Sequence, residues 1–324
     1  MKAMVLKKFG GIENFVLEDI SKPQVKAGEV SVRVIAIGLD PIDVKTRRGG
    51  GVASGYEGDA PMVLGWSISG IVDRVGPGVE NFSAGDAVFG TVNFPGRGGA
   101  YAEYVVAPAG QLARKPSGIS FTDAAGATLA ALTAWQALVD RGHVKQGDKV
   151  LVHGAAGGVG SFAVQIAKFF GACVIGTASG EDIGCVKQLG ADEVIDYKNQ
   201  RFEEITSGFD LILDTIGGEN FVRSLKVLKP EGVIVLLPSD KKDEAEKVMQ
   251  DRYIRNYYHI LAHPNGREMQ KIASLLGTED IKVRIGKVFP FRQLPEAHAA
   301  LENRKVRGKI VVSLADLGGE MSVC

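Results

Sequence analysis

The stretch VLVHGAAGGVGSFAVQIAKFF, residues 150–170, joins an apolar run to a glycine-rich turn and then to a helical pattern. Gly154, Gly157 and Gly160 stand in a G-x-x-G-x-x-G spacing directly after the apolar run. The apolar residues beyond the turn repeat at helical spacing, which predicts a helix over 157–170 with one apolar face. A strand, a glycine turn and a helix in this order are typical of a dinucleotide-binding unit.

The glycines of this turn suit a phosphate group. A side chain would keep a pyrophosphate away from the backbone, whereas glycine allows close approach. The amides and the dipole at the start of the helix then favour the negative charge. We predict that five residues of this turn contact the cofactor: Gly154, Gly157, Gly158, Val159 and Gly160. The alternative is a glycine-rich turn with a purely structural role.

The pattern around this unit indicates two kinds of structure. After an Ala- and Leu-rich helix from Phe121 to about Asp140, predicted strands and helices alternate, as in βαβ units on a parallel sheet. The first third instead has short strands between closely spaced glycine turns, which favours a small barrel or sandwich. There Val30, Val32 and Val34 alternate with polar residues, a pattern typical of a half-buried strand.

Length and charge narrow the class of protein. A chain of 324 residues suggests about two domains. The 38 basic and 38 acidic residues cancel, which argues against a nucleic-acid or anionic-membrane partner. The three widely spaced cysteines exclude a disulfide framework and fit a reducing compartment. No signal peptide or apolar run of about 20 residues is present, so we expect a soluble, cytoplasmic protein without a membrane partner.

Several segments spread over nearly the whole chain resemble the zinc-independent quinone oxidoreductases of the medium-chain dehydrogenase/reductase superfamily, a group that includes zeta-crystallin and the alkenal reductases. The segments are GEVSVRVIAIGLDPID (28–43), PMVLGWSISGIVDRVGPGVENFSAGDAVFG (61–90), GGAYAEYVV (98–106), LAALTAWQAL (129–138), LDTIGG (213–218) and VRGKIVV (306–312). The resemblance implies an α/β fold with a GroES-like β-barrel catalytic domain and a Rossmann domain with a doubly wound parallel sheet. Residues 1–121 and the return segment 263–324 would form the barrel, and residues 122–262 the inserted NADP-binding domain. It also implies a homodimer and an active site between the domains.

The function implied by this resemblance is transfer of a hydride from NADPH to a quinone or an α,β-unsaturated carbonyl. Without zinc, an enzyme cannot easily polarise an alcohol or a ketone. A quinone or an enal is already electron-poor, so such a small molecule is the more suitable acceptor. A nonenzymatic NADPH-binding protein, as in the crystallin relatives, stays open because the same glycine turn serves both.

A metal site is not expected. The zinc enzymes of the superfamily carry Cys and His ligands at positions that here correspond to Asp40 and Trp66, and no Cys precedes Cys173. His259 and His263 are four residues apart, but a zinc site needs three or four ligands and no third one is evident.

On the acceptor side, Asp40 and Tyr56 are the predicted catalytic residues. The family usually has Asn at the position of Asp40, and an ionised Asp cannot donate a hydrogen bond to a carbonyl. Asp40 therefore either contacts the substrate or nicotinamide, or has a turn role beside Pro41. Tyr56 loosely matches a tyrosine of the family's substrate pocket, and the alternative is an exposed loop tyrosine. Lys309 either approaches the cofactor or is a solvated charge.

On the cofactor side, the resemblance places four further groups. Thr133 lies beside the nicotinamide or, alternatively, packs within a helix. Tyr197 lies near the adenosine. Asp214 and Ile216 follow a strand at its carboxyl end, where open α/β sheets bind ligands. Leu237 faces the nicotinamide.

The end of the second strand of the nucleotide-binding domain bears on the choice between NADPH and NADH. An NAD-specific site places an acid there to bind the ribose 2′-hydroxyl. Residues 175–179 contain no acid, and Ser179 can donate a hydrogen bond to a 2′-phosphate. We therefore predict NADPH as the cofactor, with the cationic partner supplied by Lys187, Lys198 or Arg201.

Overall fold

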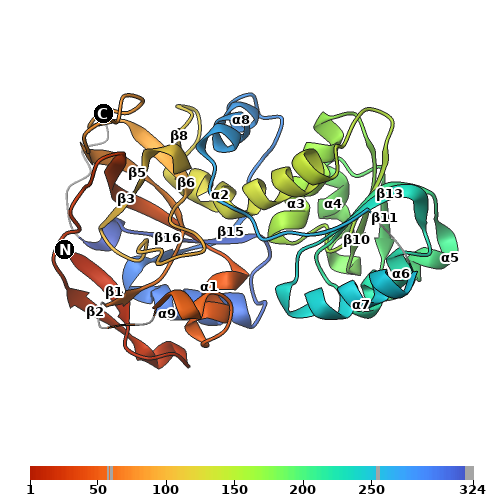
Figure 1. Ribbon diagram of the computed structural model, residues 1–324, viewed down its shortest axis with the longest axis horizontal. Helices are drawn as coiled ribbons and strands as arrows, with labels where there is room; N and C mark the ends of the chain where they lie inside the picture. Colours follow the sequence, from red (N-terminus) through yellow and green to blue (C-terminus); the bar gives the residue numbers. More distant parts are fainter. Residues whose placement is uncertain (57, 59–60, 253–255, 318–324) are drawn as a thin grey trace. The chain divides into compact units, whose positions relative to one another are not determined.

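The computed structural model describes residues 1–56, 58, 61–252 and 256–317. The chain divides into two compact units, as Figure 1 shows. Met1–Leu132 together with His263–Cys324 form the first unit, and Thr133–Ala262 form the second unit.

A six-stranded sheet organises the second unit. Its strand order is β11-β10-β9-β12-β13-β14, and all neighbouring strands are parallel. The strands are β9 (Lys149–Val152), β10 (Cys173–Ala178), β11 (Glu193–Asp196), β12 (Phe209–Asp214), β13 (Leu228–Leu236) and β14 (Tyr257–His259). Successive residues of β9, such as Val150 and Leu151, are fully buried, as expected for a parallel sheet covered on both faces. The predicted parallel sheet of a doubly wound domain is confirmed.

Helices connect the strands of this sheet. In Figure 1, α3 and α4 lie on one side of the strands, and α6 and α7 lie on the other. The helices are α3 (Gly158–Phe169), α4 (Ile183–Gln188), α5 (Phe202–Ile205), α6 (Glu219–Ser224) and α7 (Lys242–Arg252). The helix predicted over 157–170 is confirmed, and its apolar residues Phe162 and Ile166 are buried because they face the sheet.

The first unit is built mainly from antiparallel strands. One sheet has the order β15-β16-β3-β5-β6-β8 with β7 also paired to β3, and a smaller sheet has the order β2-β1-β4. The strands are β1 (Lys2–Leu6), β2 (Phe15–Asp19), β3 (Glu29–Leu39), β4 (Met62–Val63), β5 (Ser67–Val75), β6 (Ala87–Thr91), β7 (Tyr104–Pro108), β8 (Leu112–Arg114), β15 (Ile285–Pro290) and β16 (Lys309–Ser313). The expectation of a half-buried strand is wrong at Ser31, which is buried like its neighbours because β3 is central and pairs with three strands.

The C-terminal segment returns to the first unit. It contains α8 (Gly266–Gly277), α9 (Leu294–Glu302) and β16, which pairs with β3. Most of α2 (Phe121–Trp135) also belongs to the first unit, whereas the sequence places the domain boundary before this helix, at residue 121. The reason is close packing: a Cβ at Gly38 of β3 would collide with the carbonyl of Ala125 in α2.

Two further features of the helices matter for the site. The predicted helix from Phe121 to about Asp140 is α2 followed by a π-helical segment, Gln136–Arg141. The short helix α1 (Pro41–Arg47) begins directly after β3. Within the described residues, no helix has the length and apolarity required to cross a bilayer.

Candidate cofactor and acceptor sites

The glycine turn lies between β9 and α3, and two of its glycines are required by the packing of the turn itself. Gly154 has φ +64°, and a Cβ there would lie 2.6 Å from the hydroxyl oxygen of Thr215. A Cβ at Gly160 would collide with the carbonyl oxygen of Gly154. The turn therefore has no side chain at either position, because neighbouring protein atoms leave no room for one.

The start of α3 offers backbone amides to an anion. Gly157 is the N-cap residue, and no side chain accepts a hydrogen bond from the first turn of the helix. The amides of Gly158, Val159 and Gly160 have no intrahelical acceptor, because they belong to the first turn. The helix dipole adds favourable positive potential at this end. The predicted residues of the turn thus fit a dinucleotide pyrophosphate.

Asp214 shapes the loop after β12 and does not point into solvent. Its side chain is fully buried, and Oδ1 accepts hydrogen bonds from the amides of Ile216 (2.8 Å) and Gly217 (3.0 Å). Ile216 is 54% exposed at the tip of this loop. The backbone amide of Leu237, just after β13, donates to the carbonyl of Asp214 at 3.0 Å. The glycine turn, Ile216 and Leu237 therefore stand at the carboxyl ends of neighbouring parallel strands, where such sheets bind ligands.

The end of β10 holds the residues predicted for the adenosine side. Ser179 is half-buried, and its hydroxyl donates to the carboxylate of Asp182 at 3.4 Å. Tyr197, after β11, is 57% exposed. The sequence analysis missed Asp196: a Cβ at Gly180 would lie only 3.3 Å from its carboxylate, so this acid is close to the end of β10. The missed signal is that β11 ends beside β10 in a parallel sheet.

Two further residues of the second unit bear on the candidate site, Thr133 and His153. Thr133 is half-buried near the end of α2. His153, directly before the glycine turn, is 1% exposed and lies within hydrogen-bonding distance of the hydroxyls of Thr177 and Ser224. His153, which directly follows the last residue of β9, is not among the residues that the sequence analysis predicts.

In the first unit, Asp40 caps α1 and is held from two sides. Its Oδ1 is paired with the ammonium of Lys309, and the hydroxyl of Ser67 donates to Oδ2 at 2.9 Å. Lys309 also donates to the carbonyl of Leu39 at 2.9 Å and is only 6% exposed. The interpretation of Lys309 as a solvated charge is therefore wrong, because burial beside Asp40 leaves it no contact with bulk water. Asp40 does have the turn role that its position before Pro41 indicates.

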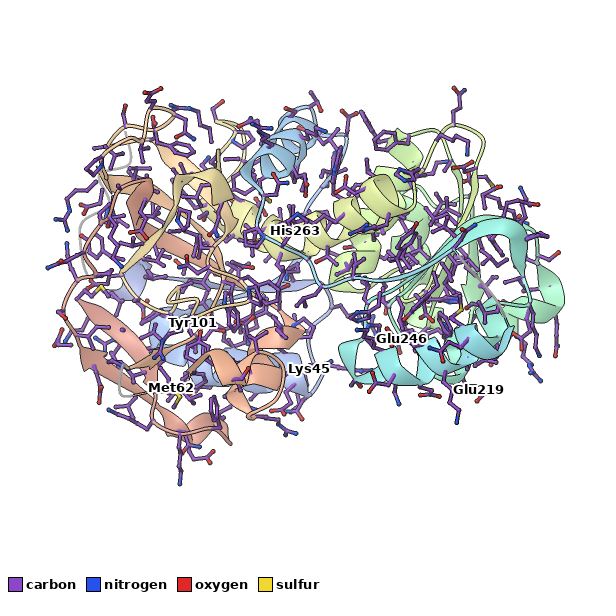
Figure 2. All side chains as sticks on the ribbon, in the orientation of Figure 1. Lys45, Met62, Tyr101, Glu219, Glu246 and His263 are labelled. Carbon is purple, nitrogen blue, oxygen red and sulfur yellow. The ribbon has the colours of Figure 1, made fainter. Side chains whose placement is uncertain are left out.

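A second carboxylate, Asp43, extends this polar cluster. The amide of Asp40 donates to Oδ2 of Asp43 at 2.8 Å, and the hydroxyl of Tyr101 donates to Oδ1 at 2.8 Å. Tyr101, labelled in Figure 2, also lies 2.9 Å from Nε2 of His298. Burial, together with the nearby charge of Asp40, raises the pKa of Asp43 to about 7. Burial lowers the pKa of His298 to about 3, with the charge of Arg47 acting in the same direction.

Tyr56 is buried, so the interpretation of an exposed loop tyrosine is wrong. Its side chain is 3% exposed; the hydroxyl accepts from the amide of Gly98 at 2.9 Å and donates to the carbonyl of Val63 at 3.3 Å. Its ring packs edge to face against Trp66, with the centroids 6.4 Å apart. Burial raises the pKa of Tyr56 above its ordinary value, so the hydroxyl stays protonated.

The residues at the positions of the zinc ligands are committed to other contacts. The indole nitrogen of Trp66 donates to the carbonyl of Gly96 at 2.8 Å, and Asp40 is paired with Lys309. His259 ends β14 and is half-buried. Within the ranges that the structure describes, no three His, Cys, Asp or Glu side chains come together in a way that would hold a metal ion.

A parallel sheet with a glycine turn, carried in one chain with an antiparallel β unit, is the architecture expected of a nucleotide-dependent dehydrogenase. Residues 26–117 match the family described as alcohol dehydrogenase GroES-like domain, and residues 189–312 match the family described as zinc-binding dehydrogenase. The chain belongs to the medium-chain dehydrogenase/reductase superfamily and fits its zinc-independent quinone oxidoreductase group, so it is an oxidoreductase of an NAD(P)-binding family.

Individual proteins of known sequence or structure agree with this assignment. The chain is 32% identical to the mitochondrial NAD(P)H oxidoreductase RTN4IP1 of Danio rerio, over 98% of this chain and 92% of the relative. It is 33% identical to the chloroplastic NADPH-dependent alkenal/one oxidoreductase of Arabidopsis thaliana, over 96% and 79%. The solved quinone oxidoreductase from Coxiella burnetii is 36% identical, with a TM-score of 0.91 over 97% of this chain and 99% of that structure. The expected fold, with a GroES-like and a Rossmann part, is confirmed.

Proposed function

We propose that this protein transfers a hydride from NADPH to a quinone or an α,β-unsaturated carbonyl, without a metal ion. The observation that carries the proposal is the start of α3, where the first-turn amides that follow the N-cap Gly157 have no intrahelical acceptor and no capping side chain. The Arabidopsis relative is named an NADPH-dependent alkenal/one oxidoreductase, and the Coxiella structure is named a quinone oxidoreductase. These names support the enzyme over the nonenzymatic binder.

Different residues of the second unit would contact different parts of the dinucleotide. The amides of Gly158, Val159 and Gly160 would bind the pyrophosphate. The exposed side chain of Ile216 and the neighbouring Leu237 would cover the nicotinamide, together with Thr133. Tyr197, with its exposed ring, would pack against the adenosine. A bound reduced nicotinamide supplies the hydride.

NADPH is the proposed form of the cofactor because residues 175–179 at the end of β10 contain no acid; the hydroxyl of Ser179, which donates to Asp182 at 3.4 Å, would turn to a 2′-phosphate. Asp196 lies nearby, but its oxygens already accept from the amide of Lys198 at 3.2 Å and from the side chain of Asn199 at 2.7 Å. Arg201 is paired with Glu203 at 2.9 Å. Lys198 is therefore preferred to Arg201 as the cationic partner of the phosphate, and Lys187 stays the third candidate.

For the acceptor, the first unit offers Asp40 and Tyr56. The hydroxyl of Tyr56 already donates one hydrogen bond and accepts another. Each carboxylate oxygen of Asp40 also has a partner. We propose that these residues fix the wall around the acceptor, and that a direct hydrogen bond from Tyr56 requires release of the Val63 carbonyl. A quinone or an enal suits such a site, because it needs little polarisation of its oxygen.

The reaction is tested by steady-state oxidation of NADPH with a panel of quinones and 2-alkenals, alongside reduction of NADP⁺ by simple alcohols. We expect turnover with at least one quinone or alkenal and little alcohol oxidation. Tight NADPH binding with no turnover across the panel would favour the crystallin-like alternative. Elemental analysis of protein purified without a metal-binding tag should show well under one zinc per chain, and activity lost on chelation would contradict the metal-free proposal.

The expected homodimer is also part of the proposal. Among the described strands, β14 has one neighbour and stands at an edge of the parallel sheet. Tyr258 on this strand is 36% exposed and Leu261 beyond it is 51% exposed. Light scattering after size exclusion should give twice the chain mass, and Tyr258→Lys should shift it toward one chain. The cytoplasmic location stays a prediction, since the relatives above are named mitochondrial and chloroplastic.

A further inference from the structure

His153 lies beneath the glycine turn, at the end of β9, and both ring nitrogens have partners. Nε2 is 2.9 Å from the hydroxyl oxygen of Ser224, and Nδ1 is 3.3 Å from that of Thr177. The ring packs edge to face on Phe202, with the centroids 4.7 Å apart. The imidazole is therefore held from three sides in the interior of the second unit.

The hydrogen bonds around His153 define its tautomer. The hydroxyl of Ser224 donates its single hydrogen to the carbonyl of Asn220 at 2.7 Å, so it can only accept from the imidazole. Nε2 must then carry the proton, and Nδ1 accepts from the hydroxyl of Thr177. The oxygen of Thr177 in turn accepts from the amide of Gly154 at 3.2 Å. A directed chain of hydrogen bonds thus runs from the glycine turn to α6.

Asn220, whose backbone carbonyl ends this chain, also contacts the loop after β12 through its side chain. The side-chain amide of Asn220 donates to Oδ1 of Asp214 at 3.1 Å, and this oxygen also holds the amides of Ile216 and Gly217. The hydroxyl of Thr215 donates to the carbonyl of His153 at 2.8 Å. His153 therefore links the two loops that stand at the carboxyl ends of β9 and β12.

The charge state of His153 suits this linking role. Burial lowers the pKa of His153 to about 4. The charges that face it act in both directions, since Asp214 and Glu203 raise the pKa and Arg223 lowers it. At neutral pH the imidazole is uncharged, so Nδ1 has the lone pair that the hydroxyl of Thr177 needs.

We propose that His153, as the Nε2–H tautomer, is a positioning residue that sets the Gly154 turn and the Ile216 loop in the arrangement that binds a nicotinamide dinucleotide. The inference rests on the proposed function, because it concerns the same cofactor. His153 is buried and touches neither phosphate nor nicotinamide in this role. Its loss should therefore weaken cofactor binding, while the chemical step at saturating cofactor changes little.

The test uses the full chain with Thr177→Val, which removes the hydroxyl at nearly constant size, and with His153→Phe, which keeps a ring against Phe202. The matched control is Thr128→Val, because Thr128 is equally buried and its hydroxyl donates to the carbonyl of Ala125 in the first unit. NADPH dissociation constants are measured by fluorescence titration of each folded variant, and kcat at saturating NADPH is measured separately. Long-range ¹H–¹⁵N NMR of the wild type, without cofactor, reports which nitrogen of His153 is protonated.

We expect the dissociation constant to rise about three- to tenfold in Thr177→Val and in His153→Phe, with kcat within about twofold of wild type. The double variant should bind NADPH as tightly as the single variant with the lower affinity, because both changes break the same chain of hydrogen bonds. Thr128→Val should lower the melting temperature and leave the dissociation constant unchanged.

Two outcomes overturn the inference alone: wild-type affinity in folded Thr177→Val and His153→Phe, or an NMR spectrum with the proton on Nδ1. A wild-type chain that binds neither NADPH nor NADH overturns the proposed function and the inference with it. The two failures are thus distinguishable by the wild-type titration.

Discussion

The ammonium of Lys309 is paired with the carboxylate of Asp40, and each side chain is only 6% exposed. The two residues are 269 positions apart, and the pairing joins β16 to the start of α1. Removal of one partner from a buried pair leaves an uncompensated charge, which costs more than the pair itself contributes. Loss of Asp40 should therefore lower the stability of the fold, whatever its effect on activity.

The first prediction concerns this pair. Asp40→Asn should lower the free energy of unfolding by about 3 kcal/mol, because the cation of Lys309 stays buried without its partner. Asp40→Asn combined with Lys309→Met should recover most of the loss. Ser67→Ala, which removes only one hydrogen bond to Asp40, should cost about 1 kcal/mol. Urea unfolding of the four proteins gives the comparison, and equal stability of Asp40→Asn and wild type would contradict it.

The second prediction concerns pH and Asp43. Its pKa of about 7 in the folded protein exceeds the ordinary value of 3.8, so the folded state binds the proton more tightly than the unfolded state. Stability should therefore fall as pH rises from about 4 to 7, by at most about 1.4 kcal/mol per pH unit from this group. His298 has the opposite effect on stability. Its pKa is lowered to about 3 in the folded protein, so its contribution to stability is lost as pH falls from 6.5 toward 3.

Denaturant unfolding of wild type and Asp43→Asn across this pH range separates the two groups. The difference in free energy between the two proteins should change with pH between 4 and 7 and be level above 7. A difference that is independent of pH would show that Asp43 is ionised in the folded protein throughout.

The third prediction concerns the glycine turn. Gly157→Asp places a carboxylate at the N-cap of α3, where the phosphates should bind. Asp is a favoured N-cap residue, so the fold should survive. NADPH affinity should fall more than about tenfold, or 1.4 kcal/mol. The matched control is Gly118→Asp, at a position where a Cβ meets nothing within 4 Å. Unchanged titration in folded Gly157→Asp would refute this placement of the pyrophosphate.

The fourth prediction concerns cofactor choice. kcat/KM should be higher with NADPH than with NADH for one acceptor at fixed ionic strength. Lys198→Ala should lower kcat/KM for NADPH about fivefold and leave NADH within twofold, because only NADPH carries the 2′-phosphate. Lys229→Ala is the control, since Lys229 pairs with Asp210 at the amino end of β13. A wild-type preference for NADH would indicate that an acid such as Asp196 binds the ribose.

The sequence predicts the second unit well because its signals are local. The strand, glycine turn and helix around Gly157 follow one another within about twenty residues, and hydrophobic periodicity is sufficient to identify them. Asp196 is not evident from the residues at the end of β10, because parallel pairing brings it there from the next strand. The role of His153 depends on Ser224, 71 positions away, and no local pattern reveals such a contact.

The first unit shows the opposite case. The substitution of Asp for the usual Asn at position 40 is visible in the sequence, but its buried partner Lys309 is near the other end of the chain. Tyr56 has a glycine-rich neighbourhood that is typical of an exposed loop. The structure buries it because its hydroxyl satisfies the backbone at Gly98 and Val63. Contacts between distant segments decide both residues.

The three glycines of the turn differ in how strongly they indicate a bound ligand. A side chain at Gly160 would collide with the backbone of the turn, and one at Gly154 would collide with Thr215. A relative that does not bind the cofactor would therefore still need glycine at both positions. At Gly157 a Cβ would lie 3.1 Å from the carbonyl of Gly154, and a small shift would admit it. Glycine at this one position is therefore explained better by the proposed phosphate site than by packing of the turn. Among related chains, a side chain at the position of Gly157 would therefore mark the members that have given up the dinucleotide while keeping the fold.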